Sequence, residues 1–179
     1  MITEKMHFTG QIWRPPFEAN SVLLQATVGC SHDDCKFCSL YHGTKFRTAP
    51  FSEIEQDLKV VQKYQPRARR VFLTGANPFV LSYDKLVRIA LLIHDYLPGV
   101  KTIGGFARIT DIRAKSLAQL EDLRRLGYDR IAIGVVSGRT TTHQYGRKGY
   151  NVPAINEQCL KLHYAGTEYN LTYLKGPVG

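Results

Sequence analysis

Three cysteines in one short segment are the residues of this chain best suited to chemistry. Cys30, Cys35 and Cys38 have the spacing C-x4-C-x2-C and follow an apolar, partly β-branched stretch that ends at Val28. Such a stretch is typical of a buried strand, and Gly29 would end it. Thiolates are ligands for zinc and for iron–sulfur clusters. Three thiolates on a four-iron cluster leave one iron without a protein ligand, so this iron would be open for chemistry.

A structural zinc site is the alternative for these cysteines, with His32 or His42 completing a Cys3His set. The fourth cysteine, Cys159, lies on the apolar stripe of an expected helix, and we interpret it as a small buried side chain. Tyr41, His42 and Lys45 follow the cysteines. We expect these three side chains to lie on the surface of the loop.

Five segments with the pattern of strands alternate with amphipathic segments. The expected strands are Ser21–Val28, Arg70–Thr74, Val100–Phe106, Arg130–Val136 and Glu168–Leu174. The helices are expected from a capping box at Ser52–Glu55, over Asp84–Tyr96, over Ser116–Leu126, and from Asn151 to Ala165. This alternation predicts parallel βαβ units in one domain. A doubly wound sheet and a (β/α) barrel both fit it.

The turns after the expected strands hold the candidate site. They are 29–38, 75–78, 108–111, 134–138 and 176–179, all rich in glycine, cysteine or polar residues. In parallel α/β folds, functional residues collect at the carboxyl ends of the strands. Arg108 has two interpretations, because it could face the site or form a structural pair with Asp111.

Composition and charge narrow the class of protein. The 179 residues are 44% hydrophobic, which fits a globular domain. Crowded thiols fit a reducing compartment, and we find neither a signal peptide nor an apolar run long enough for a membrane. We therefore expect a cytoplasmic protein without membrane contact. The net charge of +9 fits an anionic partner, either RNA or a small molecule.

The cysteine motif resembles the cluster motif of radical S-adenosylmethionine (radical SAM) enzymes. Most members have C-x3-C-x2-C, and the longer first gap occurs in some branches, including elongator-type tRNA-modifying enzymes. An aromatic residue before the last cysteine, here Phe37, is typical. Other segments are similar to a bacterial branch of the family, namely 8–10, 14–16, 18–21, 72–75 and Lys148-Gly149-Tyr150.

The resemblance implies a fold and a set of cofactors. The fold is a partial (β/α) barrel of about five parallel strands over residues 21–179, after an N-terminal extension of residues 1–20. The cofactors are a 4Fe–4S cluster on Cys30, Cys35 and Cys38, and S-adenosylmethionine. The residues implied to bind S-adenosylmethionine or to flank the cluster are Phe37, Gly75, Ala76, Asn77, Arg108, Ser137, Gly138, Leu174 and Gly176.

The same resemblance implies an activity and a partner. An electron from a donor such as flavodoxin or ferredoxin would lead to a 5′-deoxyadenosyl radical, which abstracts hydrogen from a substrate that the sequence does not name. Many relatives carry Glu-Ser-Gly after the fourth strand, whereas this chain has Val136 in place of the acid. The sequence stops after its fifth expected strand, which favours a C-terminally truncated barrel. The alternatives are a tRNA-modifying radical SAM enzyme and a non-catalytic module stabilised by zinc or an iron–sulfur cluster.

Overall fold

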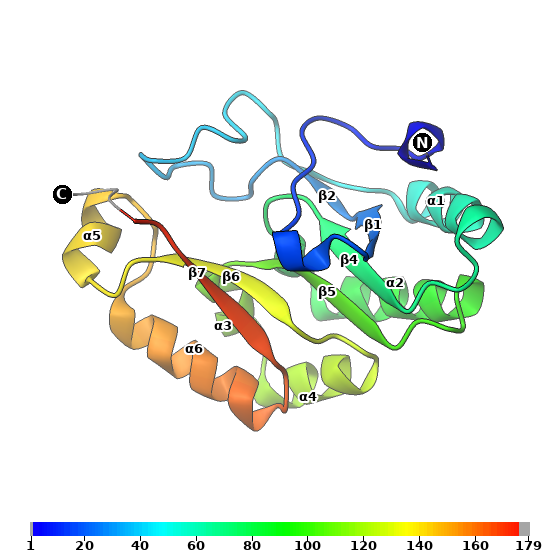
Figure 1. Ribbon diagram of the computed structural model, residues 1–179. Helices are drawn as coiled ribbons and strands as arrows, with labels where there is room; N and C mark the ends of the chain where they lie inside the picture. The colour runs from blue at the N-terminus through cyan, green and yellow to red at the C-terminus, as the bar shows by residue number, and fades with distance from the viewer. Residues whose placement is uncertain (1, 176–179) are drawn as a thin grey trace.

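The strands of the main sheet are all parallel, and their order in the sheet follows their order in the sequence (Figure 1). The computed structural model describes residues 2–175. The five strands are β1 (Val22–Gln25), β4 (Arg70–Thr74), β5 (Thr102–Ala107), β6 (Ile131–Val136) and β7 (Tyr169–Tyr173), and they lie side by side in that order. All four pairings are parallel. A doubly wound sheet reverses its strand order, and this sheet does not. The architecture is therefore a partial (β/α) barrel.

Helices connect successive strands of the sheet. The four long helices are α1 (Phe51–Tyr64), α2 (Tyr83–Tyr96), α4 (Leu117–Arg125) and α6 (Val152–Tyr164), and neighbours among them pack together along one side of the strands. The short elements are α3 (Ile109–Arg113), α5 (Thr140–Tyr145) and the 3-10 turns η1 (Ile2–Lys5), η2 (Pro16–Glu18) and η3 (Pro78–Val80). Within residues 2–175, no helix has both the length and the apolar character needed to cross a membrane.

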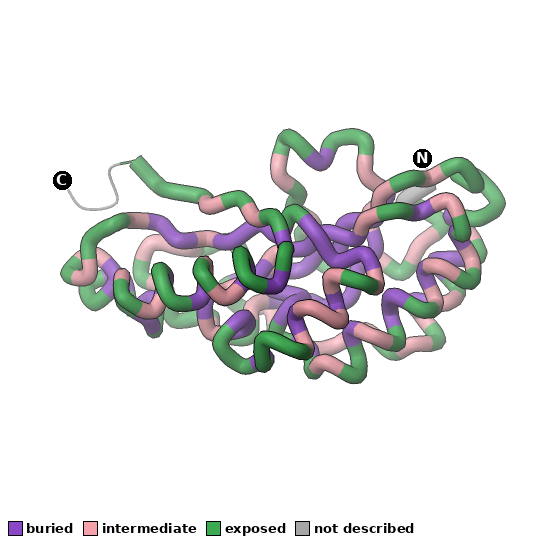
Figure 2. The backbone as a smooth tube through the Cα atoms, turned by 90° about the horizontal axis from the view of Figure 1, so that it is seen from below, coloured by how far each residue is buried: buried purple, intermediate pink, exposed green. Residues whose placement is uncertain are grey.

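The hydrophobic core lies between the sheet and the long helices (Figure 2). Leu24, Leu73 and Ile133 on the strands and Leu58 and Ile93 on the helices belong to one buried hydrophobic cluster. The strand β7 pairs only with β6 among the described strands, and its residues are half-buried or exposed. The inner strands are thus rigid supports for the loops that follow them, because they are buried on both faces.

The expectation about the first strand is wrong in detail. The expected strand Ser21–Val28 is divided, because its parallel partner β4 ends at Thr74 opposite Gln25. The chain then forms β2 (Thr27–Val28), which pairs antiparallel with β3 (Arg47–Thr48). This ribbon closes the base of loop 29–46. The segment that holds the cysteines is therefore anchored at both of its ends.

The expected capping box of α1 does not form. The helix begins at Phe51, and its N-cap residue is Pro50, whose extended backbone continues from β3. The carboxylate of Glu55 accepts a hydrogen bond from Tyr96 and does not reach back to Ser52. The side chains of Ser116 and Asn151 cap α4 and α6, which begin where the sequence predicts helices to start.

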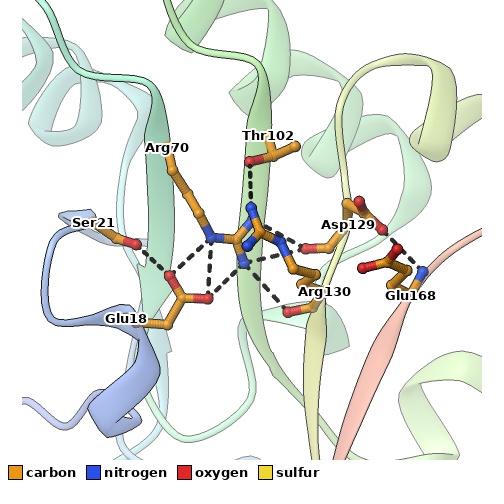
Figure 3. Close-up of polar contacts among 7 residues, drawn as sticks. All are labelled: Glu18, Ser21, Arg70, Thr102, Asp129, Arg130 and Glu168. Atoms are coloured by element: carbon orange, nitrogen blue, oxygen red, sulfur yellow. Dashed lines mark hydrogen bonds and ion pairs between the residues drawn. The ribbon is translucent and has the colours of Figure 1, made fainter.

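The N-terminal segment is tied to the sheet by a buried ion pair (Figure 3). Glu18, which is 2% exposed, accepts hydrogen bonds from Nε and Nη2 of Arg70 at 2.8 Å and 2.6 Å. Arg70 also donates to the backbone carbonyl groups of Asp129 and Arg130 at the start of β6. Gly104 on β5 leaves room for this, because a Cβ atom there would overlap the guanidinium group. The pair therefore links η2, β4 and β6.

Candidate functional site

The cysteine loop starts where β2 ends and is held against the returning chain. Gly29 has φ +71°, and a Cβ atom there would lie 2.7 Å from the carbonyl oxygen of Thr44. Only glycine fits both the conformation and the close approach. Cys30, Cys35 and Cys38 follow as free, half-buried thiols. The backbone N–H of Cys38 donates to the carbonyl of Cys35 at 3.1 Å, so these two residues lie in one turn.

The three thiols line one cavity of about 190 Å³ at the carboxyl end of the sheet. The cavity's other lining residues come from the N-terminal segment, the cysteine loop, the turns after β4 and β5, the strands β5 and β6, and the segment before α6. They are Trp13, Phe37, Leu40, Tyr41, Ala76, Phe106, Ala107, Arg108, Gly134 and Lys148. Most of this lining is apolar. Its two charged side chains, Arg108 and Lys148, are both cations. The cavity can therefore exclude water from whatever the thiols bind.

The thiols and the cations influence one another. Burial raises the pKa of the Cys35 thiol, although the charges of Lys148 and Arg108 act in the opposite direction. Burial lowers the pKa of Lys148, and the neighbouring Cys35 thiolate partly offsets this. Metal binding needs the thiolate form, so the two cations favour ligation by stabilising the anionic sulfur.

Four residues of the predicted cofactor site lie at this cavity or beside it. Phe37, Ala76 and Arg108 line it. Gly75 has φ +118°, and a Cβ atom there would overlap Thr27, so the turn after β4 packs directly on β2. The role of these residues in binding a cofactor stays a prediction.

Asn77 is fully buried, and its side chain links two segments of the site. Its amide nitrogen donates to Ser31 Oγ at 2.8 Å and to Asp111 Oδ2 at 3.1 Å. Its amide oxygen accepts from the backbone N–H of Ser31 at 3.3 Å. Asn77 thus holds the cysteine loop to the turn after β5, and its hydrogen-bonding groups are already engaged.

Three further predicted residues, Ser137, Gly138 and Leu174, are not part of the lining of the cavity. Ser137 and Gly138 follow β6, where the Ser137 hydroxyl accepts from the N–H of Arg139 at 3.1 Å. Leu174 is 46% exposed, and its N–H donates to the carbonyl of Val136. Gly176 falls outside the described residues.

Arg108 and Asp111 are paired differently from the sequence-based expectation. The Asp111 carboxylate accepts from the backbone N–H of Arg108 at 2.8 Å and not from its guanidinium group. The guanidinium donates to Thr110 Oγ1 at 3.2 Å and to the Lys148 carbonyl at 2.5 Å. Its buried Nε has no partner among the described residues. Arg108 is therefore held by its neighbours through its Nη atoms, while its Nε stays buried and unpaired.

Sequence reasoning missed part of the lining and misplaced Tyr41. That residue was expected on the loop surface, yet it is 7% exposed and lines the cavity. Burial first, and the charges of Cys30 and Cys38 next, raise its pKa to about 12. Trp13 was assigned to the N-terminal extension, and nothing in its local pattern marks it. Its place follows from long-range contacts, such as the hydrogen bond from Thr74 Oγ1 to its carbonyl at 3.0 Å.

The described donors do not form the closed ligand set of a single zinc ion. A tetrahedral zinc ion with ligands at about 2.3 Å needs sulfur atoms that converge on one point. Within residues 2–175, no three Cys, His, Asp or Glu side chains converge in that way. His32, a candidate for the fourth zinc ligand, has its Nε2 2.6 Å from the Arg147 carbonyl. Thiolates of a four-iron cluster bind separate iron atoms and lie further apart.

Comparison with known families identifies the class of protein. The family model of the radical SAM superfamily matches residues 24–177. The chain therefore belongs to the radical SAM superfamily, and the cofactors of that family are a 4Fe–4S cluster and S-adenosylmethionine. A comparison with curated proteins gives no sequence match.

Solved structures of radical SAM proteins share the fold. The cobalamin-dependent S-adenosylmethionine radical enzyme OxsB aligns with a TM-score of 0.66 and 16% identity over 85% of this chain. Methylornithine synthase (PylB) gives 0.66 and 16% over 87%. The methyltransferase TsrM from Kitasatospora setae, solved with cobalamin and a [4Fe-4S] cluster, gives 0.67 and 13% over 87%. The chain spans 23%, 44% and 31% of these proteins, respectively. At this identity the likeness establishes the fold.

Proposed function

We propose that this chain holds a 4Fe–4S cluster through Cys30, Cys35 and Cys38 and binds S-adenosylmethionine in the adjoining cavity. When bound and reduced, these cofactors supply a 5′-deoxyadenosyl radical that abstracts hydrogen from a substrate. The observation that carries the proposal is the placement of all three thiols on one largely apolar cavity at the carboxyl end of a partial barrel.

The chain's own residues bind, orient and shield. Gly29 and the β2–β3 ribbon fix the cysteine loop, and Asn77 ties it to the turn after β5. The positive charge of Arg108 on the lining of the cavity would attract the carboxylate of S-adenosylmethionine. The aromatic side chains in the lining limit the access of water.

The partners follow from the family's chemistry. An electron donor such as flavodoxin or ferredoxin would reduce the cluster. The net charge of +9 keeps RNA and small anionic molecules as the predicted substrate classes. We also propose that residues 1–20 form an extension and residues 21–179 form the domain. Trp13 of the extension lines the cavity of that domain.

Anaerobic reconstitution with iron and sulfide tests the proposal. The wild type and Cys159→Ala should bind about four iron atoms and absorb broadly near 400 nm, because Cys159 lies on α6 and packs against the core. Cys30→Ala, Cys35→Ala and Cys38→Ala should lose most of the iron. With dithionite and S-adenosylmethionine, only the first two proteins should release 5′-deoxyadenosine. Equal iron loss in Cys159→Ala and Cys35→Ala, or zinc in place of iron, would refute the assignment.

A further inference from the structure

Lys148 is a buried cation without an anionic partner. It is 9% exposed, and no described residue offers its ammonium group a hydrogen-bond acceptor or a carboxylate within ion-pair distance. Its Nζ lies 5.7 Å from the ring centres of Phe37 and Tyr150. Aromatic faces compensate only part of the cost of burying a charge. A negative charge bound in the cavity beside Lys148 would therefore be stabilised by its ammonium group.

The backbone holds this lysine in place from three sides. Its N–H donates to the carbonyl of His143 at 2.9 Å, and its own carbonyl accepts from Arg108 at 2.5 Å. Tyr150, two residues later, donates from its hydroxyl to the carbonyl of Gly134 at 2.6 Å. Gly134 also lies next to the lysine, because a Cβ atom there would be 3.7 Å from Nζ, an ordinary van der Waals distance.

The segment that carries Lys148 also contacts the cysteine loop. The N–H of Lys36 donates to the carbonyl of Gly146 at 3.1 Å. Arg147 makes two contacts with the loop. Its carbonyl oxygen lies 2.6 Å from Nε2 of His32, and its guanidinium group donates to the carboxylate of Asp34 at 3.3 Å. Segment 146–150 and loop 30–38 are thus joined by three contacts. These contacts place the backbone of Lys148 next to the loop that carries the thiols.

The negative charges that act on Lys148 are those of the cysteine thiolates. Cys35 is the thiolate that acts most strongly on Lys148, followed by Cys30 and Cys38. An oxidised four-iron cluster held by three thiolates is anionic, and reduction adds one more negative charge. A fixed cation in a poorly solvated site stabilises the reduced form more than the oxidised form.

We propose that Lys148 is an electrostatic partner of the cluster, and that its ammonium, held beside Cys35, raises the cluster's reduction potential. The consequence is that a donor can reduce the cluster more readily. The inference rests on the proposed function, because it requires a cluster on the three cysteines. Arg108 adds positive charge at the same cavity, but it is anchored by Thr110 and the Lys148 carbonyl.

A redox titration of the reconstituted protein, without S-adenosylmethionine, tests the proposal. Lys148→Met keeps the length of the side chain and removes the charge, whereas Lys148→Arg keeps the charge. Lys36→Met is the matched control, because Lys36 is next to Cys35 in sequence but is exposed, with its Nζ over the ring of Tyr145. Lys148→Met should disfavour reduction at least tenfold, a fall of about 59 mV or more in midpoint potential. Lys148→Arg and Lys36→Met should stay close to the wild type.

Each other outcome has a definite meaning. A midpoint potential in Lys148→Met equal to that of Lys36→Met would overturn the inference, even if binding of S-adenosylmethionine becomes weaker. If Lys148→Met loses the cluster while Lys148→Arg keeps it, the charge is needed to hold the cluster, which supports Lys148 as its electrostatic partner. If both variants lose it, the residue serves packing and the inference fails. A wild type that binds no cluster would refute the proposed function itself.

Discussion

The ion pair between Glu18 and Arg70 gives the sharpest test of how the N-terminal segment is attached. We predict that Glu18→Gln lowers the free energy of unfolding by about 3 kcal/mol, since breaking a buried pair leaves a buried charge without its partner. The value lies at the low end of the usual range because Arg70 keeps its bonds to the carbonyls of Asp129 and Arg130. Urea unfolding measures the change, and with a slope of about 2 kcal/mol per M the midpoint should fall by about 1.5 M.

The matched control is Asp34→Asn. Asp34 pairs with Arg147 at 3.3 Å, but their side chains are 57% and 59% exposed. Exposed pairs contribute about 0–1 kcal/mol, so this variant should stay close to the wild type. Equal losses in Glu18→Gln and Asp34→Asn would show that the buried pair does not hold the N-terminal segment.

The pH dependence provides an independent check on Glu18. Burial by itself raises the pKa of Glu18, but hydrogen bonds from Arg70 and Ser21 and the charge of Arg70 lower it overall. Because the folded pKa lies below the unfolded one, the carboxylate's contribution is complete above its ordinary pKa near 4.5. It is lost as the pH falls through the folded pKa. The difference between the wild type and Glu18→Gln should therefore shrink in acid, and a constant difference would contradict this explanation.

Three further predictions concern the cavity and its supports. Gly75→Ala should destabilise the apoprotein by about 2–5 kcal/mol, from positive φ and overlap with Thr27, whereas Gly138→Ala, which has open space, should cost under about 1 kcal/mol in the same urea assay. Burial lowers the pKa of Lys115 to about 8, so folding favours its neutral form. The stability of the wild type relative to Lys115→Met should then rise by roughly 1–3 kcal/mol between pH 8 and 10, and a fall would contradict the assignment. Trp13 is the only tryptophan and lines the cavity, so its emission should be quenched when the cluster is assembled, and unchanged emission would place it elsewhere.

Local sequence patterns predicted most of the helices and strands. The β4 range Arg70–Thr74 was predicted without error, and helices begin at Ser116 and Asn151 as expected. These features depend on periodicity and on contacts within one turn, which are visible in a single sequence. The grouping of Cys30 with Cys38 was equally clear, because their spacing places them in one short loop.

Tertiary structure decided what the local pattern could not. The strand after Gln25 divides because β4 ends opposite it, and a sequence does not state where a partner strand ends. Tyr41 and Trp13 reach the cavity through contacts between distant segments, as does Lys148. The choice between a doubly wound sheet and a partial barrel also depended on strand order, which long-range packing determines. The sequence by itself determined which groups can bind metal, and the fold decided which charges and rings surround them, because burial and proximity arise only when segments far apart in the chain pack together.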